Sequence, residues 1–120
     1  MKQPLVAILD DEKSLVDLMK QMFGIHGIST VYIASKDDVI GQLNNMAVLP
    51  DIIIMSYRMP STNGIKATRS ILQRYPRMKI IFLTVDTGIR DEALKAGATT
   101  VLNNSVALYD IVKIINGLTQ

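Results

Sequence analysis

The sequence predicts an α/β fold in which helices cover both faces of a parallel β-sheet. Short apolar segments of strand length alternate along the chain with amphipathic segments of helix length. The strand-length segments are apolar almost without a break, which is typical of strands buried on both faces. Five strand–helix repeats in this order imply right-handed crossovers and a single parallel sheet.

The predicted strands are rich in Ile, Val and Leu. They are Leu5–Leu9, Ser29–Ile33, Ile52–Met55, Lys79–Thr84 and Thr100–Leu102. Because few polar residues interrupt them, we expect all five strands to be covered on both faces of one parallel sheet.

The first two helices are predicted from apolar spacing and from a capping pattern. The apolar face of the first has the spacing i, i+3, i+4, i+7, with Leu15, Leu18, Met19 and Met22. This helix is expected to stop at Gly24. The second is expected to begin at Ser35, where Asp38 three residues later resembles a capping box.

The third helix is expected to follow Gly64, for which a positive φ is predicted. Its apolar face consists of Thr68, Ile71, Leu72 and Tyr75. It must end by Tyr75, because Pro76 cannot continue a helix.

The last two helices complete the alternation. The fourth spans about Thr87 to Ala96 and is closed by Gly97. The fifth begins near Ser105, and its apolar face consists of Leu108, Ile111, Val112, Ile115 and Leu118.

Composition limits the classes of function. The 120 residues suit one domain, residues 1–120, and the formal net charge of +2 gives no reason to expect nucleic-acid or membrane binding. The absence of cysteine excludes disulfides and thiolate metal sites and fits a reducing cytoplasm. No apolar segment approaches the roughly 20 residues that cross a bilayer. We therefore expect a soluble, cytoplasmic protein.

Function in such sheets lies at the carboxyl ends of the strands. Asp10 and Asp11 follow the first strand, Ser56 follows the third, and Thr84 ends the fourth. Adjacent carboxylates are the oxygen ligands that Mg²⁺ prefers. Asp10 and Asp11 could equally cap the first helix, whose amino terminus favours negative charge.

Five short motifs occur in order at these positions. They are Ile8–Glu12, Pro50–Met55, Arg58–Pro60 with Asn63-Gly64, Phe82–Thr84 and Ala96–Ala98. Together they make the chain resemble the receiver domain of two-component response regulators over nearly its whole length. The resemblance implies a flavodoxin-like sheet of five parallel strands in the order 2-1-3-4-5.

The resemblance also implies roles for individual residues. Asp10 and Asp11 match the acidic pair that holds Mg²⁺, and Arg58 matches the position whose backbone carbonyl is a metal ligand. Thr84 matches the hydroxyl residue that contacts the phosphoryl group.

Two positions depart from the family pattern. Ser56 stands where the family has its phosphoacceptor aspartate, and Asn104 stands where the family has a phosphate-contacting lysine. Val101 also replaces the usual aromatic residue of the fifth strand. A serine carries no negative charge and supplies no carboxylate to a metal. We therefore expect an atypical receiver, or pseudo-receiver, that is not an enzyme, needs no cofactor and binds Mg²⁺ weakly or not at all.

Two other interpretations stay open. The chain could be a working receiver in which Ser56 was introduced to block phosphorylation, although the second loss at Asn104 disfavours this. It could also be a flavodoxin-like domain that binds a small ligand between the first and third strands. A serine–histidine–acid triad is disfavoured, because the single histidine, His26, follows the first helix at the far end of the sheet.

The pseudo-receiver hypothesis implies protein partners. The expected surface comprises the fourth helix, fifth strand and fifth helix. Its expected partner is a histidine kinase, an output domain, another regulator or a second copy of the chain. No membrane partner is expected, and nucleic acid would be reached only through a separate output domain.

Overall fold

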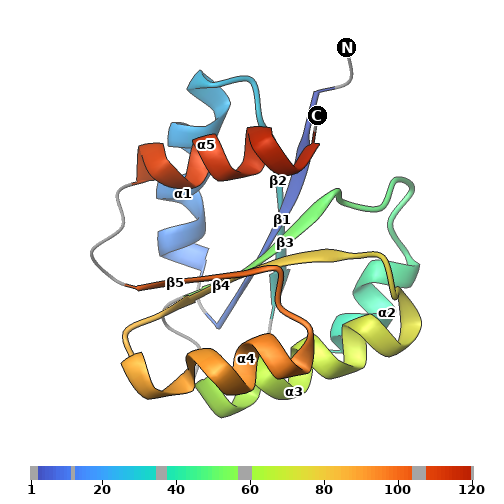
Figure 1. The fold of residues 1–120 in the computed structure, drawn as a ribbon. Helices are drawn as coiled ribbons and strands as arrows, with labels where there is room; N and C mark the ends of the chain where they lie inside the picture. Colours follow the sequence, from blue (N-terminus) through green and yellow to red (C-terminus); the bar gives the residue numbers. More distant parts are fainter. Residues whose placement is uncertain (1–2, 12, 35–37, 57–60, 104–107, 120) are drawn as a thin grey trace.

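A computed structural model describes residues 3–11, 13–34, 38–56, 61–103 and 108–119. Strands and helices alternate along this part of the chain (Figure 1). The elements are β1 (Leu5–Asp10), α1 (Lys13–Ile25), β2 (Ser29–Ala34), α2 (Val39–Asn44), β3 (Ile52–Met55), α3 (Ser61–Arg74), β4 (Lys79–Thr84), the 3-10 helix η1 (Thr87–Ile89), α4 (Arg90–Ala96), β5 (Thr100–Asn103) and α5 (Leu108–Thr119).

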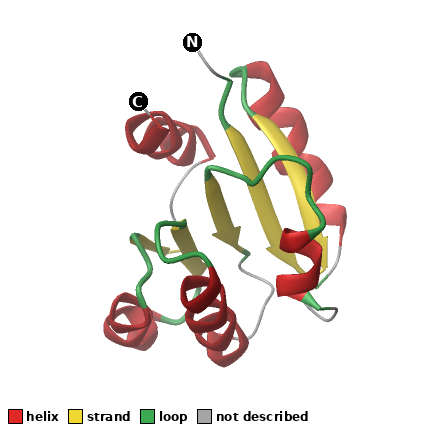
Figure 2. Cartoon of the chain, turned by 90° about the vertical axis from the view of Figure 1, so that its right-hand side faces the viewer, coloured by secondary structure: helices red, strands yellow, loops and turns green. Residues whose placement is uncertain are grey.

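The strands form one parallel sheet in the order β2-β1-β3-β4-β5. Helices α1 and α5 cover one face of the sheet, and α2, α3 and α4 cover the other (Figure 1 and Figure 2). The predicted fold class and strand order are confirmed. The sheet order reverses between β1 and β3, which puts the carboxyl ends of these strands side by side at its centre.

An apolar core lies on each face of the sheet, which explains why the strand sequences are apolar almost without a break. Along β1, Val6 and Ile8 enter the core under α1 and α5, whereas Ala7 and Leu9 enter the core under α2, α3 and α4. All four side chains are fully buried. Successive strand residues point to opposite faces, so a sheet covered on both sides needs apolar residues at every position.

Helix α1 differs from its prediction in which residues it buries. Its buried residues are Val16, Met19 and Phe23, whereas Leu18 is 54% exposed. The buried face is thus rotated from the predicted one, and it places the large Phe23 ring in the core. The side chain of Leu15 lies outside the described part of the helix.

The end of α1 also differs from the predicted end at Gly24. The helix passes Gly24 and ends at Ile25, followed by Gly27 with φ of 77°. The amide of Ile28 donates to the Phe23 carbonyl at 3.0 Å, and the amide of Gly27 donates to the Gly24 carbonyl at 3.1 Å. This is the Schellman arrangement, in which the left-handed residue is the one that must be glycine.

Two further helix starts are corrected. Asp38 is itself the N-cap of α2, because its Oδ1 accepts a hydrogen bond from the Gly41 amide at 3.0 Å. The predicted start at Ser35 lies outside the described residues. Helix α3 begins at Ser61, before Gly64. Within the described residues only Gly27 and Gly97 have positive φ, so the prediction for Gly64 is wrong.

The remaining boundaries agree with the sequence more closely. Helix α3 ends at Arg74, before Pro76, and Gly97 closes α4 with φ of 113°. The predicted start of the last helix at Ser105 lies outside the described residues. Within the described part of the chain, no helix is both long and apolar enough to span a membrane.

Gly64 is required for a packing reason. A Cβ atom at this position would lie 2.7 Å from Cζ of Phe82, whose ring is buried in the core under α3. We predict that Gly64→Ala destabilises the fold by about 1–2 kcal/mol, because the ring has to shift in a packed core. Urea denaturation measures this change.

Gly117→Ala in α5 is the matched control. A Cβ atom at Gly117 meets no described atom within 4 Å. Alanine is a better helix former than glycine, so this variant should gain up to about 1 kcal/mol. Equal effects of the two substitutions would contradict the packing role of Gly64.

Candidate site at the carboxyl ends of the central strands

The pairing of β1 with β3 brings Asp10 and Ser56 together. Leu9 is paired with Met55, and the Ser56 amide donates to the Leu9 carbonyl at 3.0 Å. Asp10 ends β1, and Ser56 directly follows β3. The Ser56 hydroxyl donates a hydrogen bond to Oδ2 of Asp10 at 2.7 Å.

Both residues lie inside the protein. Asp10 is 0% exposed and Ser56 is 1% exposed. A buried carboxylate costs free energy unless hydrogen-bond donors surround it. The Ser56 hydroxyl is one such donor to Asp10, so the two side chains form one buried polar unit.

Tyr32 is a neighbour of this unit that the sequence did not single out. Its hydroxyl donates to the backbone carbonyl of Asp10 at 3.3 Å. Tyr32 lies two residues before Ala34, which is paired with Asp10 across β1 and β2. Only the register of that pairing reveals the contact, because the two residues are 22 positions apart in the sequence.

Thr84 ends β4, the strand next to β3, and is 3% exposed. Its Oγ1 accepts a hydrogen bond from the Asp86 amide at 2.9 Å. The carboxylate of Asp86 in turn accepts from the Gly88 amide at 3.0 Å and caps η1. The hydroxyl predicted to contact phosphate therefore also shapes the start of η1. The spacing of Asp86 and Gly88 is a turn pattern that could have indicated this cap.

The other predicted site residues are only partly placed. Asp11 directly follows β1 and is half-buried. Asn103 is paired with Thr84 at the end of β5. Asn104 and Arg58 lie outside the described residues, and so does the Arg58 carbonyl expected to bind metal.

Among the described residues, the predicted magnesium ligands are the carboxylates of Asp10 and Asp11. Mg²⁺ requires nearly octahedral coordination, usually with one or two carboxylates and several waters. Among the described residues, no group of three or more His, Cys, Asp or Glu side chains is placed to hold a metal. Asp10 accepts a hydrogen bond from the Ser56 hydroxyl. An aspartate at position 56 would instead add a second carboxylate beside Asp10.

The sequence also did not predict a contact between α4 and β5. The Arg90 guanidinium donates to the Val101 carbonyl at 3.0 Å. Val101 occupies the position where the family pattern has an aromatic residue, and it is buried. The arginine thus ties α4 to β5 at Val101.

The hydrogen bond between Ser56 and Asp10 should stabilise the fold. We predict that Ser56→Ala lowers the free energy of unfolding by about 1–3 kcal/mol, because a buried carboxylate loses a donor. Ser70→Ala, at an exposed position of α3, is the control and should stay within about 0.5 kcal/mol of the parent. Chemical denaturation of both variants measures the difference, and equal stabilities would rule out this role for Ser56.

Comparison with known proteins agrees with this geometry. The profile of the response regulator receiver domain matches residues 6–116. Transcriptional regulatory protein DegU of Brevibacillus brevis is 38% identical over 71 residues, which cover 55% of this chain and 30% of DegU. Transcriptional regulatory protein LnrK of Bacillus subtilis is 37% identical over 68 residues, which cover 55% of this chain and 31% of LnrK. The chain thus spans about a third of the length of these curated relatives.

Solved structures show the same fold. A receiver domain protein from Clostridium thermocellum is 25% identical with a TM-score of 0.81, covering 96% of this chain and 93% of that one. A receiver protein from Burkholderia phymatum is 26% identical with a TM-score of 0.79, covering 96% and 94%. The chain therefore belongs to the response regulator receiver domains of two-component signal transduction.

Proposed function

We propose that this receiver domain takes no phosphoryl group at position 56 and acts through contacts with other proteins. One observation carries the proposal. Ser56 stands where the resemblance places the phosphoacceptor, and its hydroxyl is 1% exposed and donates a hydrogen bond to Oδ2 of Asp10 at 2.7 Å.

The chemistry of the two side chains supports this. An aspartate attacks phosphorus as an anion, and a metal ion offsets the charge that develops in the transition state. A serine hydroxyl is neutral and has to lose a proton to attack equally well. The hydroxyl is also buried, so a phosphodonor would have to displace the surrounding packing to reach it.

The second substitution is consistent with the first. Two unit charges about 4 Å apart interact by roughly 4 kcal/mol at an effective dielectric constant of about 20. An aspartate without the lysine, or a lysine without the aspartate, would leave a charge without its partner. With Ser56 and Asn104 both groups are absent, so their joint loss keeps the site closer to electrical balance.

The hydrogen bond between Ser56 and Asp10 supports one competing function, phosphorylation of the Ser56 hydroxyl with Asp10 as the general base. A carboxylate that accepts a hydrogen bond from a hydroxyl is within reach to act as its general base. In that case the Ser56 oxygen would bond to phosphorus, the phosphodonor's bond to phosphorus would break, and the proton would pass to Asp10. The product would be a phosphoserine ester. The burial of both side chains makes this the weaker candidate.

The proposed interaction surface consists of α4, β5 and α5. Exposed apolar side chains lie on or beside it, with Val85 at 64%, Leu94 at 39% and Tyr109 at 55% exposure. Within this surface, the Arg90 guanidinium donates to the Val101 carbonyl at 3.0 Å and ties α4 to β5. The proposed partner is a histidine kinase, an output domain, another regulator or a second copy. DNA would be reached through a separate output domain.

Phosphodonor labelling tests the proposal. We predict that the parent chain stays unlabelled in acetyl phosphate and Mg²⁺. Ser56→Asp combined with Asn104→Lys should acquire an acyl phosphate that hydroxylamine removes, because the acceptor and its cation are then both present. Intact-mass spectrometry measures the added phosphate.

Controls separate the outcomes. Ser56→Asp alone should label less than the double variant, and Asn104→Lys alone should not label. A hydroxylamine-resistant phosphate on Ser56 of the parent chain would support the competing serine ester. An acyl phosphate on the parent chain would contradict both the proposed function and the competing serine ester.

Metal binding gives a separate prediction. An added carboxylate beside Asp10 and Asp11 should make Ser56→Asp bind Mg²⁺ at least tenfold more tightly than the parent chain. The amide resonances of Asp10 and Asp11 during a Mg²⁺ titration report the affinity. Equal affinities would show that position 56 does not limit metal binding.

A further inference from the structure

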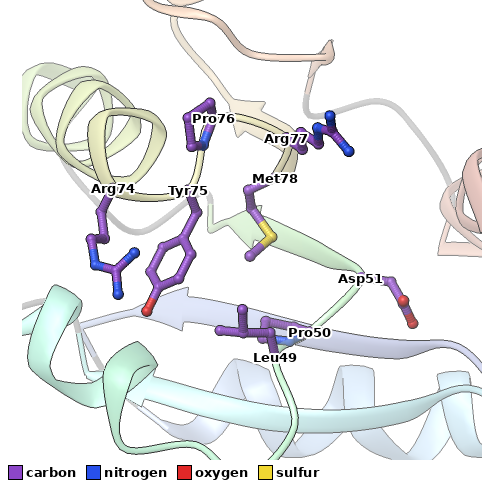
Figure 3. Close-up of a pocket in the computed structure, with 8 residues that line it drawn as sticks. All are labelled: Leu49, Pro50, Asp51, Arg74, Tyr75, Pro76, Arg77 and Met78. Carbon is purple, nitrogen blue, oxygen red and sulfur yellow. The ribbon is translucent and has the colours of Figure 1, made fainter.

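A cavity of about 410 Å³ opens at the end of the sheet opposite Ser56. It lies where β3 and β4 begin, next to the end of α3 (Figure 3). Its lining comes from two stretches of the chain: Leu49, Pro50 and Asp51, and Arg74, Tyr75, Pro76, Arg77 and Met78. The volume lies within the range of about 300–1,000 Å³ that is typical of small-molecule sites.

The interior of the cavity is mainly apolar. Pro50 is buried, Tyr75 and Met78 are half-buried, and Leu49 is 41% exposed. The Tyr75 ring, the Met78 thioether and Leu49 converge on the same space (Figure 3). Such a surface favours a flat or branched apolar group.

Hydrogen bonds hold the apolar walls in place. The Tyr75 hydroxyl donates to Oδ1 of Asn44 in α2, which fixes the far end of the ring. The Met78 amide donates to the Tyr75 carbonyl at 3.0 Å, which shapes the turn between α3 and β4. Preorganised walls reduce the conformational entropy lost when a ligand binds.

The charges at the edge of the cavity favour an anion. The Arg74 guanidinium lies 4.6 Å from the centre of the Tyr75 ring at the edge of the cavity. The carboxylate of Asp51 points away from the cavity (Figure 3) and accepts a hydrogen bond from the Leu5 amide at 2.9 Å. Arg74 is therefore the group placed to meet an anion, since Figure 3 shows Arg77 directed outward.

We propose that this cavity binds a small amphipathic anion, with a planar apolar group against Tyr75 and Met78 and a carboxylate near Arg74. This site is distinct from the ligand position between the first and third strands that the flavodoxin-like interpretation anticipated. It does not depend on the chemistry of Ser56, because the two sites lie at opposite ends of β3.

An NMR titration with naphthalene-1-acetate tests the site. The neutral amide naphthalene-1-acetamide has the same ring and serves as the matched probe. We expect the carboxylate to shift the amide resonances of Leu49, Asp51, Tyr75 and Met78 and to bind about three- to fivefold more tightly than the amide, as expected for a solvent-exposed ion pair.

Variants test which residues bind the carboxylate of the ligand and which bind its ring. Arg74→Gln should remove the preference for the carboxylate, and Arg74→Lys should restore most of it. Arg69→Gln, at an exposed position earlier on α3, should leave both affinities unchanged. Leu49→Trp should fill the cavity and weaken both compounds at least tenfold.

Three results would overturn the proposal. They are shifts confined to other parts of the protein, equal affinity for the two compounds, and equal effects of Arg74→Gln and Arg69→Gln. Ser56→Asp should bind both compounds as the parent does, so this test succeeds or fails independently of the phosphodonor experiment. A denaturation curve for each variant confirms that it is folded.

Discussion

The pairing of β1 with β3 is the constraint on which the rest of the structure depends. Leu9 opposite Met55 brings Asp10 beside Ser56 at one end of the sheet. At the other end, the amide of Asp51 donates to the Leu5 carbonyl at 2.8 Å, and the Asp51 carboxylate accepts from the Leu5 amide. A shift of this register by one residue would exchange the two faces of the strands and separate the polar pair.

Because Ser56 and Asp10 are buried, the hydrogen bond between them contributes more to stability than an exposed one would. The interior has a lower effective dielectric constant than water, so a satisfied hydrogen bond is stronger there and an unsatisfied carboxylate is more costly. A serine at this position keeps Asp10 supplied with a donor without adding a second negative charge. An aspartate at the same place would repel Asp10 unless a cation lay between them. With Ser56 at this position, the fold has a buried hydrogen bond to Asp10 and no second carboxylate beside it.

The two ends of the central strands serve different chemistry. At the carboxyl ends, polar side chains from β1, β3 and β4 gather, because parallel strands all end at this edge. At the amino ends of β3 and β4, the chain enters from turns that carry Leu49, Pro50 and Tyr75. These turns leave an apolar cavity with arginines at its edge. One sheet therefore presents a polar buried site and an apolar open one at opposite ends of β3.

The strand–helix alternation, most strand boundaries and the residues at the strand ends could all be predicted from the sequence, because apolar segments and helix breakers act locally. The resemblance to the family also predicts that Ser56 and Asn104 depart from its pattern. The sequence could not determine which face of α1 is buried, because Leu18 and Phe23 are both apolar and only packing against the sheet selects between them. Nor could it assign Gly64 to a close approach to Phe82, since the two lie on different elements. The hydrogen bond between Ser56 and Asp10, the contact of Tyr32 and the cavity beside Tyr75 all join residues far apart in sequence. Only strand register and helix packing decided them.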